Sequence, residues 1–174
     1  MKWFVILMMV MLPTALSYGQ DQDIPNEYLI KVKYLLNIPL FSEANSKISS
    51  TTSYAICLVG DTPLESILAS SKGIVIKKLP LAVYKVEELR QIDSCQMLFV
   101  ASSERYRLQI LLSEAHRHGI MTISDMRDFA RLGGMIGLLT IDNRIAFDLN
   151  LSAAGKASIS FSSHLLKLAH DIIK

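Results

Sequence analysis

Two short apolar runs, at residues 54–59 and 95–101, constrain the fold of this chain more than any other feature of its sequence. Each has the length of a β-strand, and neither shows the regular alternation of polar residues expected of a strand with one face in water. A strand buried on both faces needs a layer of helices on each side of its sheet. Helical patterns follow both runs, so the sequence predicts strands that alternate with helices in a mostly parallel sheet.

Around the first buried strand, the pattern predicts a helix, a loop and a second helix. Apolar residues recur at helical spacing from Asn26 until Pro39, with Lys31 outside the apolar face. Residues 43–53 are polar and predict a loop. After the strand, Thr62, Pro63 and Glu65 have the spacing of a capping box that opens a helix ending near residue 70.

The elements between the two buried strands are short. Strands are expected at residues 74–76 and 79–84, the latter at a sheet edge because it contains Pro80. A short helix is expected at residues 86–92. After the second buried strand, Ser102 or Ser103 is the predicted cap of a helix over residues 104–116, followed by a short strand at 120–123 and a helical turn through 130.

The C-terminal third predicts a hairpin and further helices. Asp142-Asn143 is a two-residue connection typical of tight hairpins, between strands at 135–141 and 144–149. A short helix is expected at residues 151–156, and a last helix from Ser162 or Ser163 to residue 173. The antiparallel hairpin makes the sheet mixed. We therefore expect a single-domain α/β sandwich with helices on both faces and a C-terminal hairpin and helix.

The first 19 residues have the pattern of a cleavable secretion signal. Lys2 supplies a positive charge, residues 4–12 form an apolar run, and small residues follow. An apolar helix of this length spans about 13 Å, too short for the roughly 30 Å of hydrocarbon in a membrane. Cleavage after Gly19 leaves residues 20–174 as the mature domain, and cleavage after Ser17 also fits. The alternative is a buried N-terminal helix.

Charge and cysteine content exclude several classes of protein. The 18 Lys and Arg residues exceed the 16 Asp and Glu residues by only two and are spread along the chain, which argues against a nucleic-acid binder. Two cysteines are too few for a thiolate zinc site or an iron–sulfur cluster. In the oxidising compartment that a secretion signal implies, Cys57 and Cys95 form either a disulfide or two separate buried thiols.

No motif in the sequence predicts catalysis, a cofactor or a metal ion. Gly60-Asp61 follows a strand but lacks the glycines of a phosphate-binding loop. His116 and His118 lie at a helix end, where they suit the helix dipole, without the spacing of metal ligands. The Ser-Ser-His run at residues 162–164 does not by itself create the geometry of a catalytic triad. We expect a binding protein rather than an enzyme.

Several stretches resemble the YfiR family of periplasmic regulators, also known as DUF4154. They are YAICLVGDTPLESIL, SCQMLFVASSE and MTISDMRDFARLGGMIGLLTIDNRIAFDLNLSAAGKASISFSSHLLKLA, of which the last is the most specific. The likeness extends over residues 26–173. It implies a secreted α/β domain, and it places Cys57 and Cys95 at the positions of a cysteine pair of the family, which favours the disulfide.

The resemblance also implies a function. The type member of the family restrains an inner-membrane diguanylate cyclase by binding its periplasmic sensor region, and an outer-membrane partner relieves the restraint. We therefore expect a periplasmic regulator of cyclic di-GMP signalling without catalysis, with a homodimer as a further possibility. The alternative is a small-molecule sensor that acts with a histidine kinase or receptor through a pocket near Gly60, Ser102 and Ser124, at the carboxyl ends of the strands.

The expected partner surface lies in the C-terminal third, because this stretch is the most like the family. Its candidate residues are Ile136, Asp148, Asn150, Ala154, Lys156, Phe161 and His164. Asp148 alternates with its apolar neighbours Phe147 and Leu149 along a strand, so its side chain should point away from their face. Ile136 and Phe161 can equally belong to the core.

Overall fold

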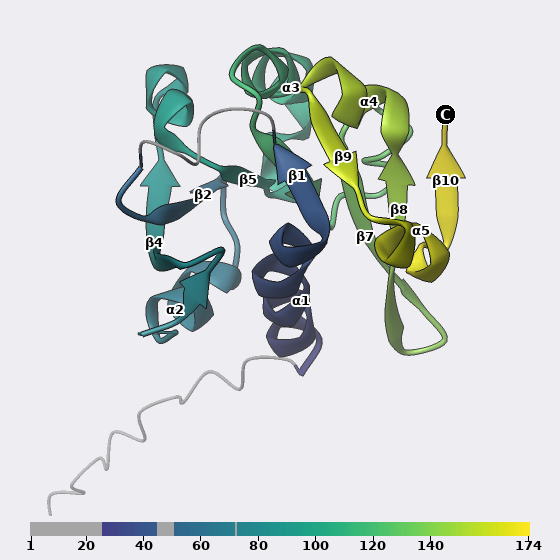
Figure 1. The fold of residues 1–174 in the computed structure, drawn as a ribbon, viewed down its shortest axis with the longest axis horizontal. Coiled ribbons are helices and arrows are strands. Elements are labelled where there is room, and N and C mark those ends of the chain that lie inside the picture. The colour runs from purple at the N-terminus through teal and green to yellow at the C-terminus, as the bar shows by residue number, and fades with distance from the viewer. Residues whose placement is uncertain (1–25, 45–50, 72) are drawn as a thin grey trace, which may run out of the picture.

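A mixed sheet of eight strands organises the computed structural model, which describes residues 26–44, 51–71 and 73–174. The strand order is β10-β8-β7-β6-β5-β2-β4-β3 (Figure 1). The strands are β2 (Tyr54–Val59), β3 (Val75–Ile76), β4 (Leu79–Val86), β5 (Met97–Val100), β6 (Met121–Ser124), β7 (Ile136–Ile141), β8 (Arg144–Asn150) and β10 (Asp171–Ile173). Among the described strands of this sheet, β3 pairs antiparallel with β4 and β7 pairs antiparallel with β8, while the other five pairs are parallel, which confirms the predicted mixed, mostly parallel arrangement. The predicted secretion signal lies outside the described residues.

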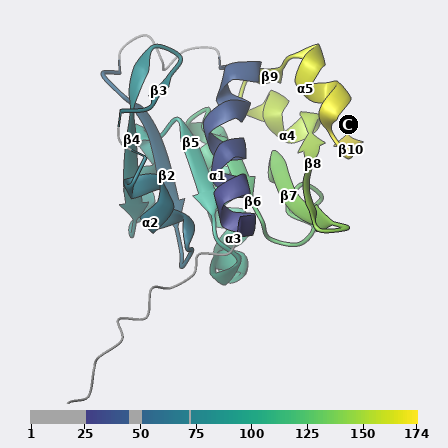
Figure 2. The ribbon, with the colours of Figure 1, turned by 90° about the horizontal axis from the view of Figure 1, so that it is seen from below.

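Helices cover both faces of the sheet. Helices α1 (Asn26–Asn37) and α2 (Leu64–Ala69) lie on one face, and α3 (Leu108–Arg117) lies on the other, as Figure 2 shows from the side of α1. The remaining helical elements are α4 (Leu151–Lys156), α5 (Ser163–Leu168) and the 3-10 helices η1 (Ile38–Phe41), η3 (Leu89–Ser94) and η4 (Ser102–Arg107). The predicted two-sided covering is therefore confirmed.

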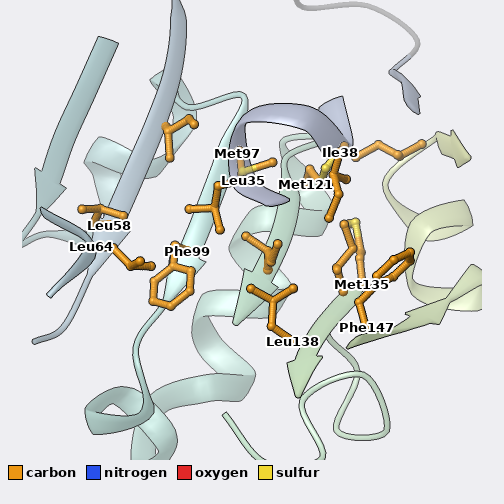
Figure 3. Close-up of a cluster of buried hydrophobic side chains, with 14 of the residues drawn as sticks. Leu35, Ile38, Leu58, Leu64, Met97, Phe99, Met121, Met135, Leu138 and Phe147 are labelled. Atoms are coloured by element: carbon orange, nitrogen blue, oxygen red, sulfur yellow. The ribbon is translucent and has the colours of Figure 1, made fainter. Parts of the chain in front are cut away.

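The side chains of β2 alternate between two cores. Tyr54, Ile56 and Leu58 join the cluster beneath α1 and α2, whereas Cys57 and Val59 join the cluster beneath α3. Figure 3 shows the first cluster, in which side chains of α1 meet those of the central strands: Leu35, Ile38, Leu58, Met97, Phe99 and Met121. Each large apolar side chain buried in this way contributes about 1.5–3 kcal/mol. The full burial of β2 explains why the sequence there is a continuous apolar run.

A disulfide between Cys57 and Cys95 ties β2 to the segment that leads into β5. The two Cα atoms are 5.9 Å apart, and both cysteines are buried in the cluster beneath α3. This confirms the predicted pairing and excludes two separate thiols. The bridge closes a loop with a sequence separation of 38 residues that contains α2, β3 and β4.

Two local features of the C-terminal third, a hairpin turn and a helix cap, form as the sequence predicts. Asp142 and Asn143 connect β7 to β8 with φ angles of 47° and 59°, the left-handed pair that a type I′ hairpin turn requires. The Ser162 hydroxyl accepts a hydrogen bond from the Leu165 amide at 3.2 Å and so caps α5. The hairpin and the cap therefore form where the residues indicate.

The predicted last helix is too long. Helix α5 ends at Leu168, because Ala169 adopts an extended conformation with ψ of 141°. Ile172 and Ile173 lie instead in β10, which pairs in parallel with β8. Both are β-branched and fit a pleated sheet better than a helix.

A second small sheet also differs from the prediction. β1 (Ser42–Ala44) extends into the expected loop and pairs antiparallel with β9 (Ile159–Phe161), so that Ser42 lies opposite Phe161. Strands of three residues are too short to show a periodic pattern, and their pairing joins segments more than 100 residues apart.

The capping box predicted at Thr62 is also wrong. The Thr62 hydroxyl accepts a hydrogen bond from the nearby Leu64 amide at 3.3 Å, while Glu65 forms an ion pair with Lys85 of β4 at 3.4 Å. The Glu65 carboxylate that a capping box needs is therefore paired with a lysine of the neighbouring strand β4. A capping box does form between Glu88 and Gln91, at the start of η3.

Removing the disulfide should lower stability by roughly 3–4 kcal/mol, because the unfolded chain gains the freedom of the closed loop. For a chain of this length, this corresponds to a melting temperature lower by on the order of 10 °C. We expect Cys95→Ser to show this drop in a thermal unfolding experiment, and reductant to produce it in wild type.

The double variant Cys57→Ser, Cys95→Ser is the matched control, since reductant has no bridge to break in it. A wild-type melting temperature that reductant leaves unchanged would contradict the stabilising role of the bridge.

Candidate partner-binding surface

Three of the seven predicted partner residues are buried and hold the domain together. Ile136 on β7 and Ala154 on α4 belong to the core cluster beneath α1. Asn150 is also buried: its side-chain oxygen accepts from the Ala153 amide at 2.8 Å, and its side-chain nitrogen donates to the Ala130 carbonyl at 2.7 Å. Asn150 therefore caps α4 and fixes it to the turn before β7.

The other four predicted residues reach the surface in separate places. Asp148 points away from the core face of β8, as its alternation predicts, and contacts the ring of His170 at 2.9 Å. Lys156 is exposed at the end of α4. Phe161 on β9 is half-buried and packs against the core, and His164 on α5 is exposed with its ring beside that of Phe41 in η1. The structure therefore divides the predicted set instead of gathering it.

An apolar surface surrounds Phe161 and His164. The rings of His164 and Phe41 are 5.3 Å apart, and the Ser162 amide donates to the Phe41 carbonyl at 2.8 Å. Leu40 and Leu168 are 53% and 59% exposed. Leu168 lies one helical turn after His164 on the same side of α5. We name the group formed by Leu40, Phe41, Phe161, His164 and Leu168 the η1–α5 patch.

Exposed apolar side chains that gather in this way mark interaction surfaces, whereas single ones are ordinary. The sequence pattern alone does not single out Leu40, Phe41 and Leu168 as surface candidates. The available signal was the Leu40-Phe41 pair directly after Pro39, where the helix has already ended. Leu168 resembled a core residue only because the last helix was expected to continue beyond it.

The carboxyl ends of the parallel strands are held together by loop hydrogen bonds. Ser103 accepts from the Asp61 amide at 3.0 Å, and Ser124 accepts from the Met126 amide at 2.8 Å. A Cβ atom on Gly60 would lie 2.5 Å from the Ser103 hydroxyl, so the two loops are in close contact there. Of the residues expected near a ligand pocket, Gly60 and Ser124 thus take part in contacts that hold the loops.

A buried lysine fastens α1 to the same end of the sheet. Lys31 is only 5% exposed, contrary to the prediction that it lies off the buried face. Its ammonium group donates to Asp125 and to Glu27, each at 2.7 Å, and Glu27 also accepts from the Thr140 hydroxyl at 3.1 Å. Apolar spacing alone cannot reveal this burial, because the partner Asp125 is 94 residues away in sequence.

The charges of this cluster stabilise one another. Burial alone would lower the pKa of the Lys31 ammonium, but the hydrogen bonds to Asp125 and Glu27 outweigh it and raise that pKa above its ordinary value. The hydrogen bond from Lys31 holds the pKa of the Glu27 carboxyl below its ordinary value, and burial opposes it. Lys31 and Glu27 are thus both charged near neutral pH.

We expect Lys31→Met to lower the free energy of unfolding by about 1–3 kcal/mol at pH 7, because the largely buried Asp125 carboxylate loses its cation. Lys33→Met, on the exposed side of the same helix, is the matched control and should change it by less than about 0.5 kcal/mol. Denaturant unfolding measures both. Equal losses in the two variants would contradict a specific role for Lys31.

The same pair of proteins should differ in their response to acid. A carboxyl whose folded pKa is depressed contributes stability above its unfolded pKa of about 4.3 and loses it as pH falls through the folded value. The stability difference between wild type and Lys31→Met should therefore shrink below about pH 4 as Glu27 becomes protonated.

Within the described ranges, no group of three or more His, Cys, Asp or Glu side chains could hold a metal ion. In the same part of the chain, no helix is long and apolar enough to cross a membrane.

Two solved structures are similar to the chain at low sequence identity. A conserved domain protein from Vibrio cholerae O1 biovar El Tor has a TM-score of 0.52 and 9% identity, with 85% of this chain and 60% of that chain covered. An ABC domain in complex with L-Trp from Streptococcus pneumonia has a TM-score of 0.49 and 10% identity, with 69% and 55% covered. The chain thus spans 55% to 60% of the length of these two proteins.

No curated protein matches the chain in sequence. The sequence signature of DUF4154, described as YfiR/HmsC-like, matches residues 28–170, which is most of the chain. The matched range runs from α1 to the residue before β10, so it includes both cores, the disulfide and the η1–α5 patch. The protein therefore belongs to the YfiR/HmsC-like family.

Proposed function

We propose that this protein is a periplasmic regulatory binding protein that restrains an inner-membrane signalling partner, a diguanylate cyclase of cyclic di-GMP signalling. The observation that carries the proposal is the family match over residues 28–170. The role needs binding and no catalysis.

A periplasmic location is supported by two further features. The buried disulfide between Cys57 and Cys95 suits an oxidising compartment, since cytosolic thiols are kept reduced. Residues 1–19 have the sequence pattern of a secretion signal. From the periplasm, the protein can reach the periplasmic domain of an inner-membrane partner.

Restraint at a distance follows from differential binding. If the protein binds the inactive state of its partner more tightly than the active state, it shifts the partner's population toward the inactive state. A change from 99:1 to 1:99 requires about 5.5 kcal/mol of differential binding. An interface of about 1,600 Å² can supply this much.

The η1–α5 patch is the surface that we assign to the partner. Leu40 and Leu168 provide exposed apolar side chains, and the rings of Phe41 and His164 lie side by side at the end of the small sheet where β1 begins and β9 ends. Phe161 and His164 come from the predicted set. An outer-membrane-associated protein that covers this patch would release the restraint by competition.

A charge placed in the patch should release the partner. Leu40→Asp and Leu168→Asp each put a carboxylate into the interface, so cells that express them should have higher cyclic di-GMP than cells with wild type. Because both side chains are already exposed, the free energy of unfolding should change by less than about 0.5 kcal/mol. Val75→Asp is the matched control, since Val75 is 61% exposed on β3, in the edge strand farthest from β10 in the sheet order.

Cyclic di-GMP measured in whole-cell extracts, together with thermal unfolding of each purified variant, tests this prediction. Wild-type levels in both patch variants, with normal folding, would remove the patch from the interface.

Deleting residues 2–19 should abolish the restraint even if the protein accumulates, because it then stays on the wrong side of the membrane. An exported Cys57→Ser, Cys95→Ser variant separates loss of access from loss of the bridge. If the folded double variant still restrains cyclic di-GMP production, the restraint requires access to the periplasmic domain of the partner and not the disulfide. If the cytosolic form restrains output as well as wild type, the periplasmic mechanism is wrong.

A further inference from the structure

A polar cavity lies between α3 and α4, which are neighbours in Figure 1. Its volume is about 260 Å³, enough for a small molecule of a few non-hydrogen atoms. Gln109, Ser113 and His116 line it from α3, and Ser152 and Lys156 line it from α4. The proposed function makes no use of this cavity.

His116 is the unusual residue of the lining. Its Nε2 atom is buried and has no hydrogen-bond partner among the described residues. Burial and the nearby Lys156 ammonium lower the pKa of the imidazole below its ordinary value, so the ring is neutral at pH 7. The ring lines the cavity, and its buried Nε2 atom reaches an occupant only if the side chain reorients toward the cavity. An unpaired buried nitrogen at this position indicates a missing partner.

The positive charge of the cavity lining favours a negatively charged ligand. Lys156 is exposed and forms no salt bridge within the described residues, and no Asp or Glu lines the cavity among them. The acidic residue on the same helix as His116, Glu114, is already paired with Arg117 and His118. The cavity therefore has a positive charge without compensation.

Hydrogen-bond donors complete the site. The hydroxyl groups of Ser113 and Ser152 lie in the lining, and each can turn its proton toward an acceptor. Asn150 and Gln109 already donate to backbone carbonyls at 2.7 Å and 3.1 Å, and they fix the walls instead. An oxygen-rich anion matches one ammonium, one imidazole nitrogen and two hydroxyls better than a cation or an apolar ligand does.

We infer that the cavity between α3 and α4 binds a small oxyanion, a carboxylate or phosphate group held between His116 and Lys156. Such an anion accepts a hydrogen bond from the imidazole and neutralises the Lys156 charge. The occupant also joins α3 to α4, which carries Lys156 and leads into β9 and the η1–α5 patch.

Titration with sodium phosphate and with sodium succinate, at constant ionic strength, tests the inference. Both probes are followed by the NMR signals of the His116 ring in the full secreted form of the protein. We expect saturable shifts of these signals and a rise in the pKa of His116, because the bound anion favours the protonated ring. Stronger binding of phosphate points to a phosphorylated ligand, and stronger binding of succinate to a carboxylic acid.

Lys156→Met should weaken the binding by about tenfold or more, since it removes the charge but keeps most of the side-chain length. Lys33→Met loses the same charge from an exposed site on α1 and should bind as wild type does. Thermal unfolding verifies that both variants are folded. If neither probe gives a saturable shift of the His116 signals in wild type, or if Lys156→Met binds as tightly as wild type, the inference is overturned.

Discussion

Burial of β2 on both faces is the constraint on which the rest of the structure depends. Because every residue of this strand is buried, the chain must provide a helical layer on each side of the sheet. The segment before β2 supplies α1 for one face, and the segments after it supply α2, η3 and α3. The disulfide from Cys57 to Cys95 adds a covalent link to the residue that follows η3, so β2 is also tied to the α3 side of the sheet.

The same constraint determines how the candidate surface is presented. Helix α1 packs its buried side chains on the sheet while Lys31 fastens its first turns to Asp125, at the carboxyl end of β6. The other end of α1 continues directly into η1, which carries Leu40 and Phe41. A helix that is fixed along its length holds these two residues in one position. The packing of α1 therefore positions the η1 side of the patch, and a surface that is positioned before binding lowers the ordering cost of an interface.

The sequence was most informative where local chemistry decides the structure. The apolar run of β2, the Asp142-Asn143 turn and the Ser162 cap each depend on residues that are adjacent in the chain. The expected helix over Ile172 and Ile173 was wrong because their pairing with β8, a long-range contact, outweighs the local pattern. The burial of Lys31 and the pairing of β1 with β9 could not be predicted for the same reason.

For the candidate site, the sequence located only part of the surface. Phe161 and His164 were found through the resemblance to the family, together with Ile136, Asn150 and Ala154, which the structure buries. A family pattern contains core and surface positions alike, because packing constrains residues as strongly as binding does. Leu40 and Phe41 lie more than 100 residues before His164, and only the folded chain brings them together.

Photocrosslinking in living cells asks directly whether the η1–α5 patch holds a membrane-bound cyclase. A photoreactive amino acid is placed at position 40 in the patch or, as a control, at position 75 on β3. We expect a crosslink from position 40 to an inner-membrane protein that carries a diguanylate cyclase domain, and none from position 75. Equal crosslinking from both positions, or none to such a protein from position 40, would contradict the proposed role of the patch.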